Sequence, residues 1–353
     1  MKPWALVAAC GIAAACGGPS KGNPQDGGGP DTDEAEAGAP AWHVVLENLT
    51  PTLLSIWGTS ATDVFAVGGP LGNGTPTAVL HYDGTAWTDL HAGGTDTFWW
   101  VHGTAGTDVW FVGTSGRIAH WDGTQFAAFT SGTTATLFGV FAASATDVWA
   151  VGGTPDAGTS QPNDILLHYD GTSWSPSPLP QTLGRAFFKV WGTGSDDLYV
   201  VGELGTIWHR TGTTWALEAD SPPVATGNLT TVHGCSATEV YAVGGDDVLR
   251  WDGTAWSRAN VSLENIVNGV SCASPGDVVL VGGGGLKQRL VAGAWVSDFA
   301  TEPHQDLHGA WSDPSGGFWA AGGDFLSDPQ PNATRLGTLA YYGTTPPAST
   351  QSP

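Results

Sequence analysis

The sequence predicts an all-β fold: a seven-bladed β-propeller with an N-terminal strand that closes the last blade. Three observations lead to this prediction. A unit of about 40 residues recurs seven times, the first six units each hold four short strand patterns, and the last unit lacks its fourth strand. Four-stranded units of this period are typical of propeller blades.

The repeat is an apolar stretch followed by Gly-Thr-Ser-Ala-Thr-Asp, then Val-Trp-Ala-Val-Gly-Gly, then a stretch ending His-Tyr-Asp-Gly-Thr-x-Trp. Its clearest copies are IWGTSATDVFAVGG (56–69) with LHYDGTAW (80–87), and VFAASATDVWAVGG (140–153) with LHYDGTSW (167–174). One residue before the second strand marks the units: Asp63, Asp108, Asp147, Asp197, Glu239, Asp277 and, degenerately, Gly317.

Each element of a unit has a physical reason. In the first unit the pattern predicts strands over 53–57, 64–67 and 78–82, with a fourth from Trp87, because β-branched and aromatic residues favour strands. Asp83-Gly84 predicts a tight hairpin whose two turn positions can both need positive φ. The marker carboxylates are expected to accept backbone N–H bonds, and a calcium site is disfavoured because each turn offers one carboxylate. The repeated tryptophans are expected to pack between neighbouring blades: Trp87, Trp174, Trp215, Trp256 and Trp295.

The two ends of the repeat region predict ring closure. The last unit shows strands over 305–311, 317–321 and 336–342, and then Pro346-Pro347 replaces the turn and the tryptophan. The missing strand stands at the front, from Pro40 to Leu46, after the remnant of a turn. Pairing it with the third strand of the last unit removes an exposed sheet edge. The propeller is therefore expected to span 41–345, followed by a C-terminal tail at 346–353.

The N-terminus predicts export. Residues 1–16 read as a lipoprotein signal peptide: Met1-Lys2, a short apolar run, and Ala13-Ala14-Ala15 before Cys16, the expected lipidated (palmitate-bearing) residue. The alternatives are an ordinary signal peptide, or Cys10, which would leave a very short signal. Residues 17–40 read as a disordered Gly/Pro/acidic linker. By resemblance to enterobacterial sorting, Gly17 implies an outer membrane lipoprotein, with its periplasmic or surface face undetermined.

The net charge of −22 opposes binding to nucleic acid or to anionic lipid surfaces. We therefore expect membrane contact only through the lipid anchor, and a monomeric domain. Cys235 and Cys272 stand at nearly equivalent points of the fifth and sixth units. They form a candidate disulfide, and the sequence leaves open whether they are bonded.

One repeat position is a candidate ligand site. The residue six places before each marker falls at the end of the innermost strand, so these residues are expected to ring the central channel. An aromatic and histidine ring can stack on a sugar or hold a cation, and packing of the blades is the alternative. The candidates are Trp57, His102, Phe141, Trp191, His233 and Trp311, with Ser271 at the seventh place.

Two further features bear on function. Four predicted third strands carry a histidine, but on separate blades, so no metal site and no cofactor is expected: His81, His120, His168 and His209. Insertions at 70–77, 154–164 and 324–334 all follow a second strand, so they should crowd one face, where loops on a rigid scaffold often carry recognition. Neutral decoration is the alternative.

DVWAVGG with LHYDGTSW resembles the repeats of Asp-box propellers, of the photosystem assembly-factor type and of kelch proteins. It is most similar to repeat lipoproteins of myxobacteria. The resemblance covers about residues 41–345 and implies the fold rather than an activity. The leading hypothesis is a non-enzymatic, surface-anchored scaffold for an envelope or extracellular protein. The alternatives are a carbohydrate-binding propeller for polysaccharide and a glycosidase or lyase, but the sequence shows no paired carboxylates or nucleophile motif.

Overall fold

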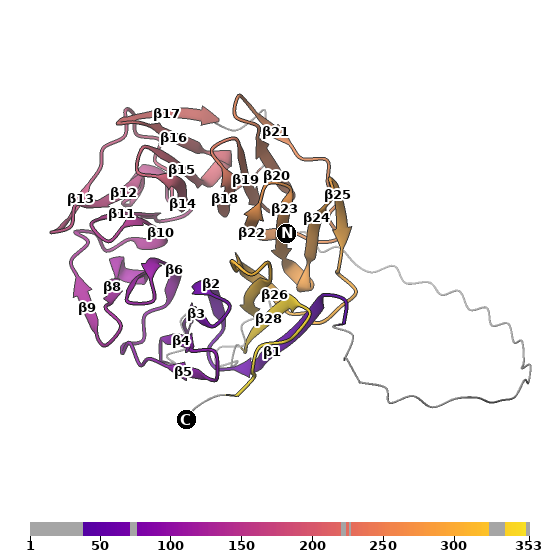
Figure 1. Ribbon diagram of the computed structural model, residues 1–353. Helices are drawn as coiled ribbons and strands as arrows, with labels where there is room; N and C mark the ends of the chain where they lie inside the picture. The colour runs from indigo at the N-terminus through magenta and orange to yellow at the C-terminus, as the bar shows by residue number, and fades with distance from the viewer. Residues whose placement is uncertain (1–37, 71–75, 220–223, 226, 325–335, 351–353) are drawn as a thin grey trace, which may run out of the picture. The chain divides into compact units, whose positions relative to one another are not determined.

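The computed structural model describes residues 38–70, 76–219, 224–225, 227–324 and 336–350. The signal peptide with Cys16, nearly all of the linker and most of two insertions (70–77 and 324–334) lie outside these residues. Residues 38–353 form one compact unit. Its strands form seven antiparallel four-stranded sheets, which Figure 1 shows as blades around a central axis. The predicted fold class is confirmed.

The blades follow the repeats in chain order, each from its innermost to its outermost strand. Blade one contains β2 (Leu53–Ser60), β3 (Asp63–Gly68), β4 (Ala78–Tyr82) and β5 (Trp87–Asp89). Blade two contains β6 (Phe98–Ala105), β7 (Asp108–Gly113), β8 (Ile118–Trp121) and β9 (Phe126–Phe129). Blade three contains β10 (Thr136–Ser144), β11 (Asp147–Gly153), β12 (Ile165–Tyr169) and β13 (Trp174–Pro176). Blade four contains β14 (Phe187–Gly194), β15 (Asp197–Gly202), β16 (Ile207–Thr211) and β17 (Thr214–Ala219).

The remaining blades keep this order. Blade five contains β18 (Thr231–Ser236), β19 (Glu239–Gly244), β20 (Asp247–Trp251) and β21 (Trp256–Arg258). Blade six contains β22 (Val267–Ser274), β23 (Asp277–Gly282), β24 (Lys287–Val291) and β25 (Ala294–Ser297). Blade seven contains β26 (Asp306–Ser312), β27 (Phe318–Gly323), β28 (Gly337–Gly343) and β1 (Ala41–Leu49). Short 3-10 turns follow some second strands: η1 (Thr114–Gly116), η2 (Gly158–Ser160), η3 (Glu203–Gly205) and η4 (Gly283–Gly285).

The ring is closed by the N-terminal strand, as the sequence predicts. β1 pairs antiparallel with β28, from Ala41 opposite Gly343 to Leu49 opposite Gly337. Trp42, Val45 and Leu46 are buried in this blade. The outer edge of β28 is therefore covered by the chain's own first strand, and the first and last parts of the propeller share one sheet.

The C-terminal tail packs on blade one, a contact that the sequence did not predict. After β28 it crosses to blade one, where the backbone N–H of Trp87 donates to the carbonyl of Thr350 at 2.9 Å. The N–H of Ala348 donates to the Tyr82 hydroxyl at 3.1 Å, and Ala348 packs on the apolar cluster between blades seven and one. The tail is thus a second link across the closing joint.

The core lies between the blades and not within them. Seven apolar clusters each join neighbouring blades, and the repeated tryptophans contribute as predicted. Each packs on the second-strand aromatic residue of the preceding blade. Ring centroids are 5.7 Å apart for Trp87–Trp319, 5.5 Å for Trp174–Trp110, 6.0 Å for Trp215–Trp149, 5.8 Å for Trp256–Tyr199 and 6.4 Å for Trp295–Tyr241.

The Asp-Gly hairpins differ from expectation in one respect. Only the glycine takes a positive φ, as in Gly84 at 90°, whereas Asp83 does not. The Asp83 side chain instead caps the turn: its Oδ1 accepts the N–H groups of Thr85 and Ala86 at 2.8 and 2.9 Å. These bonds, with that of the Thr85 hydroxyl, lower the pKa of Asp83 to about 2. The same cap recurs at Asp122, Asp170 and Asp252.

Candidate functional site

The six predicted ring residues lie together in the centre of the propeller. They come from the innermost strands of six blades, and adjacent rings pack closely, with centroids 5.5 Å apart for Trp57 and His102. Trp100, which the sequence interpretation missed, joins them because it lies two residues earlier on β6. All line one cavity of about 80 Å³: Trp57, His102, Phe141, Trp191, His233 and Trp311, with Trp100.

Each tryptophan of this ring is matched by a glycine in the next blade. A Cβ built on Gly234 would overlap the indole of Trp191, which lies 2.6 Å away at Cζ3. The same matching joins Trp57 to Gly103 and Trp311 to Gly58. The glycine that follows the ring position is therefore the space that the preceding tryptophan fills.

Each histidine of the ring is matched in a different way. His102 Nδ1 accepts the backbone N–H of Ala142 at 3.1 Å, and His233 Nδ1 accepts that of Cys272 at 3.2 Å. The seventh position follows the same rule, because Ser271 Oγ accepts the N–H of Ser312 at 2.9 Å. Histidine and serine at the ring position thus bond the backbone of the next blade, while tryptophan fills the space beside a glycine of the next blade.

These contacts favour packing over ligand binding in the channel. A cavity of about 80 Å³ has room for two or three waters at about 30 Å³ each. Ligand sites usually measure about 300–1,000 Å³. The indoles that suggested a sugar platform occupy the space that a sugar would need. Contact between these six residues and a ligand stays a prediction that the cavity's size does not support.

The two ring histidines are held neutral. Burial lowers the pKa of His102 to about 3, with a further contribution from His233, and lowers that of His233 to about 4. Each imidazole accepts a backbone N–H at Nδ1, so the neutral ring carries its proton on Nε2. The neutral form is required for the contact between blades.

We expect acid to weaken the propeller through these rings. Between pH 4 and 6.5 the unfolded histidines bind protons that folded His233 does not, so the free energy of unfolding falls as pH drops. His233→Gln, which accepts an N–H at every pH, should flatten this dependence of the melting temperature. His91→Asn, at a histidine that is 83% exposed, is the control and should leave the slope unchanged. Equal slopes for all three proteins would contradict the assignment.

In the first four blades, each marker aspartate bonds a histidine on the third strand of the same blade. Asp63 Oδ1 bonds His81 Nε2 at 2.7 Å, and the His81 ring stacks on Phe65 with centroids 4.3 Å apart. The pairs Asp108–His120, Asp147–His168 and Asp197–His209 repeat this contact at 2.7–2.9 Å. In the seventh blade, where Gly317 stands at the marker, Asp313 supplies a buried carboxylate beside it. Among the described residues, no three metal-ligating side chains gather at one point.

Cys235 and Cys272 are joined by a disulfide, with Cα atoms 5.2 Å apart. It links β18 to β22 through Cys272, whose backbone N–H also donates to His233 Nδ1. The joint between blades five and six is therefore covalent.

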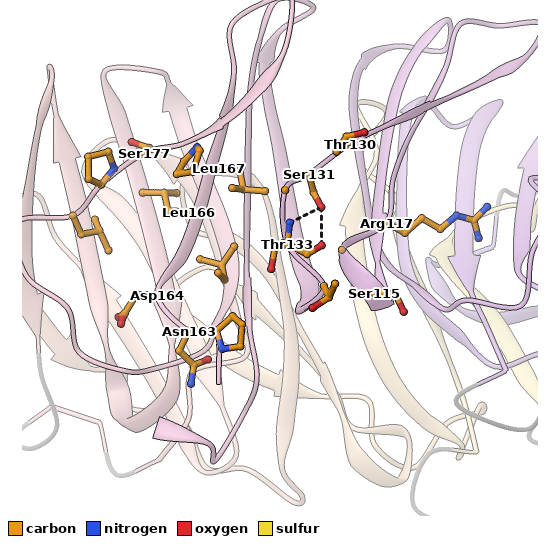
Figure 2. A pocket seen from close by; sticks show the side chains of 18 of the residues that line it. Ser115, Arg117, Thr130, Ser131, Thr133, Asn163, Asp164, Leu166, Leu167 and Ser177 are labelled. Carbon is orange, nitrogen blue, oxygen red and sulfur yellow. Dashed lines mark hydrogen bonds between the residues drawn. The ribbon is translucent and has the colours of Figure 1, made fainter. Parts of the chain in front are cut away.

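A groove with a volume of about 1010 Å³ lies between blades two and three (Figure 2). Its lining combines apolar side chains with hydroxyl groups. The apolar residues include Phe129, Ile165, Leu167 and Leu179, and the hydroxyl groups come from Thr130, Ser131, Thr133, Ser177 and Thr182. No motif marked this groove, because it arises where the outer strands of two blades separate.

One predicted insertion forms a wall of the groove. Residues 154–164 are tied down by Asn163, whose Nδ2 donates to the carbonyls of Thr154 and Gly158 at 3.1 and 2.8 Å. Glu203 of the next blade accepts the N–H of Asp156 at 2.6 Å. Asp156 and Asp164 both take positive φ, of 62° and 53°. The wall is therefore ordered before anything binds, which lowers the entropic cost of recognition.

Positive charge is directed away from the groove. The Arg117 guanidinium donates to the carbonyls of Ala92 and Gly93 at 2.9 and 2.8 Å and lies 4.3 Å from the Phe98 ring centroid. Figure 2 shows its side chain pointing away from Ser131 and Thr133. The groove thus offers apolar side chains, hydroxyl groups and the carboxylates of Asp96 and Asp164, a lining that disfavours a phosphate or carboxylate ligand.

The fold is that of a seven-bladed β-propeller, and an ordered groove lies between its second and third blades. No protein-family model matches the chain, and no curated protein matches it. Solved structures are similar at the level of the fold. The structure "Streptogramin B lyase structure" is 12% identical with a TM-score of 0.64, covering 85% of this chain and 97% of its own. "YCF48 bound to D1 peptide" is 14% identical with a TM-score of 0.63, covering 86% and 97%. "Crystal structure of RRP9 WD40 repeats" is 12% identical with a TM-score of 0.63, covering 86% and 98%.

Proposed function

We propose that this propeller is a non-enzymatic protein-interaction module, and that it binds an extended segment of an envelope or extracellular protein in the groove between blades two and three. The groove carries the proposal: it has a volume of about 1010 Å³, its wall is ordered, and its lining combines apolar side chains with polar groups. Sites with these properties are typical of recognition on rigid scaffolds. A propeller of similar fold is described in complex with a peptide, which supports this mode of use.

We further propose that the domain is a lipoprotein anchored through Cys16 at the outer membrane. Ala13-Ala14-Ala15 before Cys16 supports this, although these residues lie outside the described part of the chain. In the described residues, no helix is long and apolar enough to cross a membrane. The linker joins β1 at Ala41, and the groove opens on the face at the other end of this strand, where the connections between blades run.

The groove predicts the behaviour of one variant pair. Thr130→Trp places an indole at an exposed position of the groove lining, and we expect it to reduce partner capture at least tenfold, which corresponds to about 1.4 kcal/mol. His91→Trp adds the same side chain at the equivalent exposed position of blade one and should bind like the wild type. The measurement is affinity capture by the full chain from envelope and extracellular fractions, followed by titration of the captured protein. Capture that survives Thr130→Trp would place the interaction elsewhere.

A further inference from the structure

The aspartate–histidine pair of the repeat is absent from blades five, six and seven, and its replacement in blade five lies at the joint with blade six. In the first four blades an aspartate marker bonds a histidine of the third strand, as Asp63 bonds His81. Blade five has Glu239 and Arg250 at these two places, with Arg250 Nε 3.5 Å from Glu239 Oε1. In blade six, Gly276 stands before the marker, where blade one has Thr62, and the Asp-Gly-Thr turn is shortened to Gly293.

These changes converge on one pocket. The small residues Gly276 and Gly293 leave space between the two blades, and a cavity of about 500 Å³ opens there. Its size is within the usual range of small-molecule sites. Apolar walls come from Leu290 and Trp295, while Glu239, Arg250 and Asn260 supply polar groups. The site is separate from the groove, which lies between blades two and three.

Glu239 is held in place by a neighbouring side chain, while Arg250 is partly exposed and has further N–H donors to offer a ligand. Glu239 is 8% exposed, and its Oε1 accepts the hydroxyl of Tyr241 at 2.9 Å. The Arg250 side chain is 43% exposed, and its five N–H donors exceed what Glu239 and Tyr241 can accept. Trp295 packs edge-on against Tyr241, with centroids 6.4 Å apart, which orients the indole in the wall.

We propose that this pocket binds a saccharide ring. An indole beside fixed donors and acceptors matches a sugar, whose apolar C–H face stacks on an aromatic ring while its hydroxyls both donate and accept. Charge favours a neutral sugar, because Arg250 is already paired with Glu239 and the chain carries a net charge of −22. The carbohydrate function considered from the sequence thus moves from the channel to the joint between blades five and six.

The test uses the full chain and a panel of glucose, galactose, mannose, N-acetylglucosamine and glucuronate, measured by saturation-transfer NMR and calorimetry. We expect at least one neutral sugar to bind, and Trp295→Ala to weaken its binding at least tenfold. Trp256→Ala removes the equivalent indole from the joint between blades four and five and should leave binding intact. Absence of transfer for every sugar at about 10 mM, a concentration ten times above a millimolar Kd, would overturn the proposal.

A second variant removes the risk that loss of an indole unfolds the domain. Glu239→Asp with Arg250→His recreates the aspartate–histidine pair of the first four blades, so the fold should be retained with an unchanged melting temperature. Sugar binding should still fall at least tenfold. Unchanged binding in this folded variant would overturn the proposal, whatever Trp295→Ala does. Thr130→Trp should bind sugar normally, so that failure of the groove and failure of this pocket are distinguishable.

Discussion

Deletion of Ala41–Leu49 is expected to abolish cooperative unfolding of the propeller or to lower its melting temperature by more than about 10 °C. β1 completes the sheet of blade seven and buries Trp42, Val45 and Leu46. At about 1.5–3 kcal/mol for each buried large apolar side chain, the loss is about 5–9 kcal/mol. That is comparable to the whole stability of an ordinary domain, and 1 kcal/mol shifts the melting temperature of a domain of this size by about 2 °C.

Calorimetry of the deleted chain and of the wild type is the measurement. The control deletes residues 17–37, which removes a longer segment but keeps β1, and should leave the melting temperature unchanged. Addition of a synthetic peptide spanning 38–50 should restore part of the lost stability, because the vacated edge of β28 is its binding site. An unchanged melting temperature after removal of β1 would refute closure by this strand.

Gly234→Ala is expected to destabilise the propeller by about 1–3 kcal/mol, the usual cost of overpacking. The added methyl group would overlap the Trp191 indole and contact Val240 Cγ2 at 3.0 Å. The backbone itself tolerates a side chain here, because Ala142 and Cys272 occupy the equivalent positions of blades three and six. The expected loss of stability therefore comes from overlap with the neighbouring tryptophan and not from the backbone conformation at Gly234.

The double variant Trp191→His with Gly234→Ala tests this directly. It recreates the His102–Ala142 contact, in which the imidazole accepts the backbone N–H at 3.1 Å. We expect the double variant to be more stable than the sum of the two single losses predicts, by at least about 1 kcal/mol in a double-mutant cycle. Denaturant unfolding of the four proteins supplies the cycle. Additive losses would show that the pairing of ring residue and following residue is not a physical coupling.

Much of the fold could be predicted because the repeat carries its own register. The marker position, an aspartate in five of the seven blades, fixed the phase of the repeat, and the missing tryptophan after Gly343 pointed to β1. The position of the channel ring also followed from phase alone, since Trp57 and His102 stand six residues before their markers. A sequence repeat predicts the positions that are equivalent in every blade, such as the strands and the channel ring.

The sites that do not repeat could not be predicted in this way. The groove depends on the separation of β9 from β13 and on the ordering of the 154–164 loop by Asn163, and neither leaves a pattern in the sequence. Two features of the sequence could have predicted further contacts between and within the blades. Glycine follows the ring position wherever tryptophan precedes it in the previous blade, and Glu239 with Arg250 replaces the aspartate–histidine pair.

The pairing of β1 with β28 also determines when the propeller can finish folding. His43 contacts Gly343, 300 residues further along, so the first strand of the propeller must wait for the third strand of its last blade. Contacts between such distant residues slow folding, because a long loop must close before they form. A chain that stops before residue 337 has no partner for its first strand and presents two open sheet edges. Synthesis of β28 is therefore a condition for a sealed ring, and chains that stop before it stay exposed to proteases.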